Sequence, residues 1–141
     1  DEKNGPPPEV NLFNEKNNGE SLLSLIEKDY IKSAHDISLG GLLTAISKMC
    51  IKGNKGIKFR KLKNLLNKFE YFFAEDQGRY LIEINSKDLV NVKKILDKNS
   101  VFHEELGVII EKEMIIDEKT KLTIDELRSY NTNWLENYMD S

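Results

Sequence analysis

Two polar segments of the sequence contain residue types that could bind a ligand. The first, residues 33–42, reads SAHDISLGGL and combines His35, Asp36 and Ser38 with the pair Gly40–Gly41. A glycine pair between a strand and a helix lets a ligand approach the backbone and directs amides and the helix dipole toward it. Such a turn suits a phosphate or a carboxylate, but a simple tight connection between strand and helix uses the same residues. The segment alone leaves both interpretations open.

The second polar segment is Glu75–Arg79, with the sequence EDQGR, which precedes an expected strand. Loop residues at the start of a strand are well placed to line a cleft. The guanidinium of Arg79 could hold a carboxylate or phosphate through two parallel hydrogen bonds. The spacing by itself favours the simpler interpretation, a polar turn with a weak surface ion pair between Glu75 and Arg79.

The remaining chemically active side chains give weaker signals. His35 and Asp36 are adjacent, so on a strand they point to opposite faces and do not form a catalytic dyad by themselves. His103 stands among acidic residues and is expected to be a solvated surface histidine. Cys50 lies on the apolar side of an expected helix, where a buried, unreactive thiol is the natural interpretation.

Composition limits the classes of function. The chain has 141 residues, 39% hydrophobic and 32% charged, which predicts one globular domain with a real core. A formal charge of −3 argues against a polyanion-binding protein. One cysteine and two histidines exclude a disulfide framework and a His/Cys metal cluster. No apolar run is long enough to span a bilayer. Because the chain starts at Asp1 without a signal-peptide pattern, we expect an intracellular domain of a longer protein.

One segment supports a different class of function. Residues 52–68 contain seven Lys and Arg and no acidic residue. This run is the basis of an alternative hypothesis, a non-enzymatic module that binds nucleic acid. The acidity of the whole chain and the scarcity of aromatic residues in the run argue against it.

The elements that must position these residues follow from hydrophobic spacing. Pro6–Pro8 favour an extended backbone, so residues 1–18 are expected to be a linker that leads into a domain at 19–141. Helices are expected at 22–30, 42–50, 62–73, 86–96 and 123–138, and strands at 31–37, 55–60, 80–84, 107–110 and 114–116. Strands that alternate with helices indicate an α/β or α+β class in which helices cover a mixed sheet.

Local signals mark several helix ends. Gly53 and Gly56 are expected to end the second helix, and Ser86 to cap the fourth. The aromatic end of the third helix, 69–73, is expected to straighten out. Thr123 and Glu126 form a capping box, because each can accept a hydrogen bond from the other's free amide. The last helix places four large side chains on one side: Leu127, Tyr130, Trp134 and Tyr138.

In their order along the chain, these segments resemble a known domain. The sequences HDISLGGL and AEDQGRYLIEI, preceded by PPPEVNL and followed by EELGVI and a closing helix, are similar to the C-terminal domain of the aminoimidazole ribonucleotide synthetase superfamily. Within the superfamily, the similarity is greatest to the large subunit of formylglycinamidine ribonucleotide synthase. It covers roughly residues 5–140, and the order of the segments is more specific than either motif.

The resemblance implies a three-layer α/β/α domain with a mixed sheet. It implies a full enzyme that uses ATP and magnesium to join glutamine-derived ammonia to formylglycinamide ribonucleotide, a cytoplasmic step of purine biosynthesis. The implied partners are N-terminal synthetase domains of the same chain, a glutaminase subunit and a small accessory subunit. The chemistry belongs to those N-terminal domains. This domain is therefore expected to be an inactive scaffold with no cofactor of its own.

Candidate ligand-binding or phosphate-binding residues follow from the matched positions. They are His35, Asp36, Ser38, Gly40 and Gly41 in the first segment, and Glu75, Gln77 and Arg79 in the second. Two positions depart from the family pattern, with Leu39 in place of an aspartate and Asp76 in place of a serine. No catalytic residue and no metal ligand is implied. The alternatives are aminoimidazole ribonucleotide, hydrogenase-maturation and selenophosphate synthetases, the first of which typically shows a Thr-Gly-Gly-Gly run that this sequence lacks.

Overall fold

The computed structural model describes residues 9–60 and 67–140, with the side chains of 135–137 left out. The predictions for Pro6–Pro8 and for Leu62–Leu66 therefore lie outside the described residues. The chain divides into two compact units, each built from two stretches of sequence. Unit 1 is Asp1–Leu42 with Ala74–His103, and unit 2 is Leu43–Phe73 with Glu104–Ser141.

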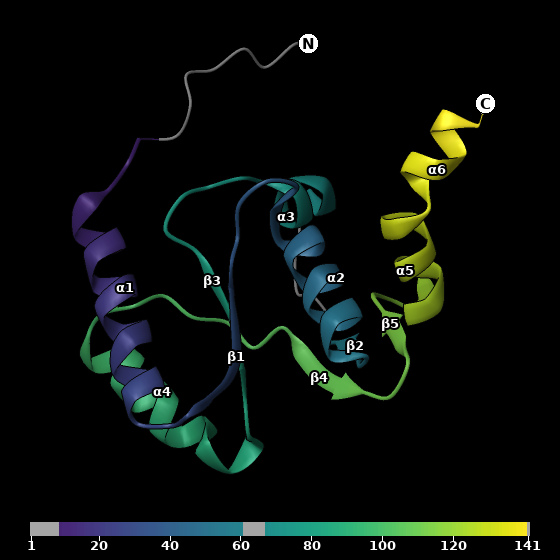
Figure 1. Cartoon of the computed structure of the whole chain (residues 1–141). Coiled ribbons are helices and arrows are strands. Elements are labelled where there is room, and N and C mark those ends of the chain that lie inside the picture. Colours follow the sequence, from purple (N-terminus) through teal and green to yellow (C-terminus); the bar gives the residue numbers. More distant parts are fainter. Residues whose placement is uncertain (1–8, 61–66, 141) are drawn as a thin grey trace. The chain divides into compact units, whose positions relative to one another are not determined.

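Unit 1 is a pair of strands with helices packed against it (Figure 1). Its elements are α1 (Leu12–Glu27), β1 (Ile31–Asp36), β3 (Tyr80–Ile84), the 3₁₀ turn η1 (Ser86–Asp88) and α4 (Leu89–Lys98). The strands β1 and β3 are antiparallel, and Asp36 pairs with Tyr80 at one end of the ladder. This pairing brings the two polar segments of the sequence to the same end of the sheet.

The core of unit 1 lies between α1, α4 and the strands. Leu25 of α1 packs with Val92 and Leu96 of α4, and all three are buried. Partly buried apolar residues from both strands surround this cluster, including Ile31, Ile82 and Ile84. Ser21 is also buried, and its hydroxyl accepts a hydrogen bond from the Asn99 amide at 2.9 Å. The two helices are thus joined by apolar contacts and by one satisfied polar pair.

Unit 2 is built around a mixed four-stranded sheet with the order β4-β2-β5-β6. The strands are β2 (Gly56–Phe59), β4 (Gly107–Ile110), β5 (Glu113–Ile115) and β6 (Lys121–Thr123), and the helices are α2 (Gly41–Gly53), α3 (Lys68–Phe73), α5 (Ile124–Thr132) and α6 (Trp134–Met139). The first two residues of α2 belong to unit 1. β2 is central, antiparallel to β4 and parallel to β5.

The buried side chains of unit 2 come from all its layers. They include Ile46 and Cys50 of α2, Phe59 of β2, Phe72 of α3 and Met114 of β5. The rings of Phe59 and Phe72 meet edge to face, with centroids 5.6 Å apart. The burial predicted for Cys50 is therefore confirmed. No helix in the described residues combines the length and hydrophobicity that a bilayer-spanning segment needs.

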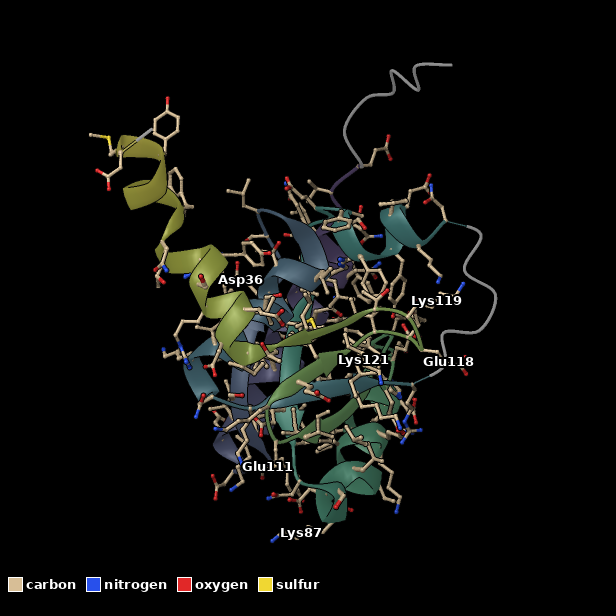
Figure 2. All side chains as sticks on the ribbon, turned by 90° about the vertical axis from the view of Figure 1, so that its right-hand side faces the viewer. Asp36, Lys87, Glu111, Glu118, Lys119 and Lys121 are labelled. Atoms are coloured by element: carbon tan, nitrogen blue, oxygen red, sulfur yellow. The ribbon has the colours of Figure 1, made fainter. Side chains whose placement is uncertain are left out.

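The turn between β5 and β6 is organised by one carboxylate. Asp117 accepts hydrogen bonds from the amides of Lys119 and Thr120, at 2.9 and 2.8 Å, and from the Lys68 ammonium at 3.3 Å. Glu118, Lys119 and Lys121 mark this turn and the start of β6 in Figure 2. The backbone hydrogen bonds, with Lys68 next, lower the pKa of Asp117 from 3.8 to about 2.

This turn predicts a pH dependence. Because the pKa of Asp117 is lower in the folded than in the unfolded chain, its stabilising effect is complete above pH 3.8 and is lost as the pH falls through about 2. We expect the amide resonances of Lys119 and Thr120 to titrate with a midpoint near 2 in NMR spectra, and to lose this titration in Asp117→Asn. A midpoint close to 3.8 would contradict the hydrogen-bonded turn.

The fold class is confirmed, since helices and a mixed sheet are both present, although the strands form two sheets rather than one. Several boundaries differ from the expectation. α1 begins at Leu12, inside the expected linker 1–18, because the Asn11 side chain caps it by accepting from the Asn14 amide at 3.0 Å. The linker boundary itself stays a prediction.

Three other local predictions were wrong. Ser86 does not cap α4: it opens the turn η1, and the chain enters α4 from Asp88. The aromatic segment Phe69–Phe73 is helical rather than straightened. The last helix is split at Asn133 into α5 and α6. The capping box is confirmed, because Thr123 and Glu126 bond each other's amides in both directions.

Candidate functional site

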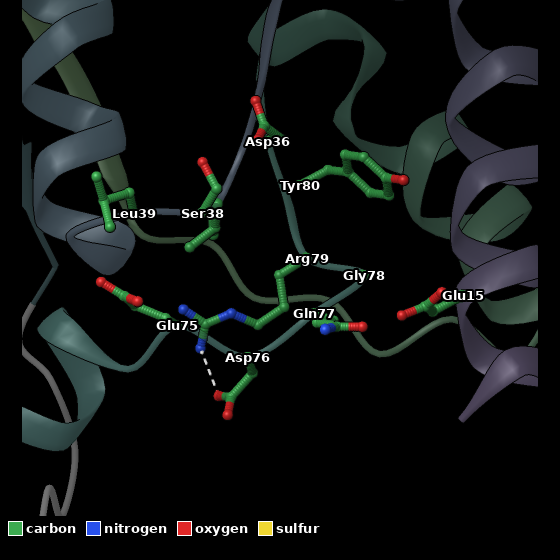
Figure 3. Close-up of a pocket in the computed structure, with 11 residues that line it drawn as sticks. Glu15, Asp36, Ser38, Leu39, Glu75, Asp76, Gln77, Gly78, Arg79 and Tyr80 are labelled. Atoms are coloured by element: carbon green, nitrogen blue, oxygen red, sulfur yellow. Dashed lines mark hydrogen bonds and ion pairs between the residues drawn. The ribbon is translucent and has the colours of Figure 1, made fainter. Parts of the chain in front are cut away.

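The two polar segments meet at one end of the β1–β3 pair. Beyond the ladder, the amide of Ile37 donates to the carbonyl oxygen of Arg79 at 2.9 Å, which extends the pairing by one residue. A pocket of about 460 Å³ lies here, within unit 1 (Figure 3). Its lining combines residues of both segments with one residue of α1, Glu15. The strand pairing thus brings residues of the two polar segments into one pocket.

The Gly40–Gly41 turn is closed by a side chain of the other segment. The amide of Gly40 donates to Oε1 of Glu75 at 2.7 Å, and the amide of Gly41 donates to the carbonyl oxygen of Ser38 at 2.9 Å. Both glycines have positive φ, 83° and 67°, a conformation that other residues adopt only with strain. The Gly40 amide, a candidate anion-binding group, thus already binds the chain's own carboxylate.

Arg79 is also held by its own loop. One terminal nitrogen of its guanidinium contacts Oδ2 of Asp76 at 3.2 Å, and the other donates to the carbonyl oxygen of Ala74 at 3.2 Å. Figure 3 shows the contact between Arg79 and Asp76 as a dashed line in the lower part of the view. Nε of Arg79 is buried and has no partner among the described residues. The expected surface pair of Arg79 with Glu75 is therefore replaced by a pair with Asp76.

Helix α1 fixes the remaining side of the pocket. Gly78 has a φ of 69°, and a side chain there would overlap the Glu15 side chain. The amide group of Asn18 donates to the carbonyl oxygen of Gly78 at 2.9 Å. Glycine suits this position, because the left-handed backbone conformation strains other residues and a Cβ would force the Glu15 side chain to shift. The loop 75–79 is therefore held by α1 as well as by β1.

The electrostatics of the pocket oppose the binding of a bare anion. Four carboxylates line it, from Glu15, Asp36, Glu75 and Asp76, against the single guanidinium of Arg79. A phosphate placed here would face like charges, and it would also have to displace Glu75 from the Gly40 amide. Within the described residues, no three His, Cys, Asp or Glu side chains are grouped to hold a metal ion that could offset this charge.

The structure gathers most of the sequence-predicted residues, though not all. Asp36, Ser38, Gln77 and Arg79 line the pocket with Glu75. Gly40 takes part through its bond to Glu75, while His35 and Gly41 are outside the lining. The sequence reasoning missed Glu15 and Tyr80. Glu15 follows the Asn11 cap in the first turn of a helix, and this acidic first turn was the signal that could have found it.

The two histidines have local partners. Nδ1 of His35 lies 2.6 Å from the carbonyl oxygen of Asp36 and 3.2 Å from its carboxylate, so these neighbouring side chains meet despite their opposite directions on the strand. Nδ1 of His103 lies 3.0 Å from the carbonyl oxygen of Val101, and its side chain is about three quarters buried. His103 is thus less solvated than predicted.

Three cations of the basic run 52–68 pair with carboxylates. Lys55 pairs with Glu111 at 3.0 Å, Arg60 with Glu105, and Lys68 with Asp117 at 3.3 Å. Lys61 and Lys63 lie outside the described residues. Because these cations already face acidic partners, the run offers phosphates less free positive charge than its sequence indicates.

The contact between Glu75 and Gly40 gives a local prediction. Removal of the carboxylate in Glu75→Ala leaves the Gly40 amide without its acceptor, which costs about 1 kcal/mol for a helix-start hydrogen bond. We expect amide hydrogen exchange at Gly40 to become roughly fivefold faster, by NMR. Gly41 is the internal control, because its amide bonds to Ser38 and keeps its rate. Equal exchange at Gly40 in both proteins would show that the bond is absent in solution.

Comparison with known proteins identifies the domain. The family model described as "AIR synthase related protein, C-terminal domain" matches residues 1–118. The chain belongs to this family. Its motif-bearing segments, the pocket and the β1–β3 pair all lie inside the matched region.

Curated proteins similar to this chain include PurL subunits of several bacteria. The chain is 63% identical over 140 residues to phosphoribosylformylglycinamidine synthase subunit PurL of Pelagibacter ubique, covering 99% of this chain and 19% of the relative. It is 37% identical over 135 residues to the PurL subunit of Bartonella bacilliformis, covering 96% of this chain and 18% of that protein. The chain thus spans about a fifth of the length of these relatives. Their shared name and the family match confirm the predicted resemblance. The names of these relatives give no support to the alternative assignments, which were other synthetases of the superfamily.

Solved structures confirm the fold of the domain. The structure described as PurLQS from Thermotoga maritima matches with a TM-score of 0.74 at 22% identity, covering 85% of this chain and 22% of that one. T. maritima PurL complexed with ATP matches with a TM-score of 0.69 at 23% identity, covering 82% of this chain and 22% of that one. At these identities the likeness shows the fold alone.

Proposed function

We propose that this domain is a C-terminal, scaffolding part of a phosphoribosylformylglycinamidine synthase. The whole enzyme would use ATP to join glutamine-derived ammonia to formylglycinamide ribonucleotide in purine biosynthesis, in the cytoplasm. The observation that carries the proposal is the 63% identity to a PurL subunit across 99% of this chain. Names of solved neighbours support the substrates, since T. maritima PurL has been described in complexes with ATP and with FGAR.

The role proposed for this part is to line and support a cleft, without chemistry of its own. The pocket residues do not fit the phosphates of ATP, because four carboxylates surround one guanidinium and the Gly40 amide is already bonded. The ATP and Mg²⁺ of the whole enzyme would then bind to residues outside this chain. The pocket side chains instead fix the loop 75–79 against β1 and α1, which gives a rigid wall.

The proposal also includes partners. N-terminal synthetase domains of the same polypeptide would supply the catalytic residues, and a glutaminase subunit with a small accessory subunit would supply ammonia. The relatives are named as subunits, and a PurLQS assembly from T. maritima has been solved, which supports a multi-subunit enzyme.

A binding experiment tests the scaffolding role. We expect isothermal titration of the purified chain with Mg²⁺–ATP to show no saturable heat at millimolar nucleotide. We also expect no ADP release when formylglycinamide ribonucleotide, ATP and ammonia are added together. Full-length PurL of P. ubique is the positive control in both measurements. Saturable binding to the isolated chain, abolished by Arg79→Ala, would contradict a purely structural pocket.

A further inference from the structure

The last two helices carry three exposed aromatic side chains at regular spacing, which we call the aromatic face. We use this name for the side chains of Tyr130, Trp134 and Tyr138, which recur every four residues on α5 and α6. Their exposed fractions are 75%, 61% and 72%. The sequence placed them on one side of a helix, as core-facing residues usually are, yet the structure leaves them at the surface. Large aromatic side chains gathered on a surface mark sites of protein contact.

A groove in unit 2 continues the aromatic face. It encloses about 280 Å³ and is lined mainly by apolar side chains, among them Leu43 and Ile51 of α2, Phe73 of α3 and Leu127 of α5. Tyr130 lines the groove and also belongs to the aromatic face. An aromatic surface beside an apolar pocket is the usual anatomy of an energetically important contact, because side chains of the partner can fill the pocket.

The size of the relatives points to what covers this surface. P. ubique PurL is 63% identical across 99% of this chain, yet this chain accounts for only 19% of its length. We propose that the aromatic face and its groove dock against another part of the same long polypeptide, so that the contact is made between domains. This inference rests on the proposed function, and it adds the surface through which this domain would be held in the enzyme.

The charges around the aromatic face favour such a partner over a second copy of this chain. Asp125 and Glu126 of α5, and Asp140 directly after α6, are exposed. Arg128 is already bonded to Asp125 at 2.9 Å and to Asn54 at 3.0 Å. A second copy would bring another chain of net charge −3 to this surface. The complementary surface is therefore apolar at its centre.

Hydroxyl-radical footprinting with mass spectrometry tests the contact on the whole enzyme. The protein is full-length P. ubique PurL in which the 140 matching residues are replaced by this chain. We expect oxidation of Tyr130 and Trp134 to be at least fivefold slower in this chimera than in the isolated chain. Trp134 is the single tryptophan of the chain, so its peptide is unambiguous. Equal rates in the two proteins would overturn the proposal.

Further measurements distinguish a second copy of this chain from the proposed interdomain contact. They also distinguish failure of the docking from failure of the proposed function. Protection of Trp134 in the isolated chain that grows with its concentration would identify a second copy and overturn the proposal. In the chimera, Tyr130→Ser with Trp134→Ser should lower the melting temperature by about 5 °C or more, whereas Phe102→Ser, an exposed aromatic of unit 1, should change it by about 1 °C. An active chimera with an unprotected face refutes the docking alone. A protected face in an inactive chimera refutes the function alone.

Discussion

We expect Gly56→Ala to lose about 3 kcal/mol or more of its free energy of unfolding, enough to disrupt unit 2. Gly56 begins the central strand β2, pairs with Ile110 of β4 and lies against the backbone of Glu113 in β5. A Cβ at this position would overlap the carbonyl oxygen of Glu113. The obstacle is backbone rather than a flexible side chain, so relief requires the strands to separate. Urea unfolding followed by circular dichroism measures the loss.

Gly53→Ala is the matched control for this variant. Gly53 ends α2 three residues earlier, and a Cβ there would meet no atom within 4 Å. Its stability should stay within about 0.5 kcal/mol of the original chain, since alanine is a better helix residue than glycine. Similar stabilities for Gly56→Ala and Gly53→Ala would show that β2 and β5 do not approach each other as closely as described.

Leu25→Ala should have the second large effect, a loss of about 2–5 kcal/mol. Leu25 is 1% exposed at the centre of the unit 1 core, against Val92 and Leu96 of α4. Truncation leaves a cavity between α1 and α4, because the helices are also tied by the bond between Ser21 and Asn99 and can close only in part. Thermal unfolding by circular dichroism gives the size of the loss.

Leu23→Ala is the control for Leu25→Ala. It separates the effect of losing a buried side chain from the effect of replacing leucine by alanine in the same helix. Leu23 is in the same helix and is 60% exposed, so its truncation should cost no more than about 0.5 kcal/mol. Equal losses for Leu23→Ala and Leu25→Ala would mean that α1 does not pack on α4 through the described face.

Elements with a strong local signal were predictable from the sequence. The alternation in residues 80–84 and the stretch 31–37 gave β3 and β1 nearly to the residue. The box of Thr123 and Glu126 was found because both partners lie within one helical turn. The capping of α1 by Asn11 is equally local, but the polyproline stretch before it favoured a linker. Ser86 was a reasonable cap by residue type, and the chain used a 3₁₀ turn there instead.

Features that depend on distant contacts were not predictable in this way. β6 has only three residues and exists because it pairs with β5, from Glu113↔Thr123 to Ile115↔Lys121. The candidate site shows the same limit. Its two segments were recognised by residue type, but the bond from Gly40 to Glu75 spans 35 residues and depends on the pairing of β1 with β3. The same bond closes the turn that the sequence marked only as a candidate anion site.

The turnover number of the P. ubique chimera tests the central claim most directly. The claim is that this chain serves as a structural part of the synthase and that its pocket does no chemistry. We expect the chimera to form formylglycinamidine ribonucleotide with kcat within about threefold of natural P. ubique PurL, and to keep that rate with Glu75→Gln, since an equally long amide still accepts from Gly40. The isolated chain should show no turnover. A folded chimera without activity, or a hundredfold fall in kcat from Glu75→Gln, would contradict the claim.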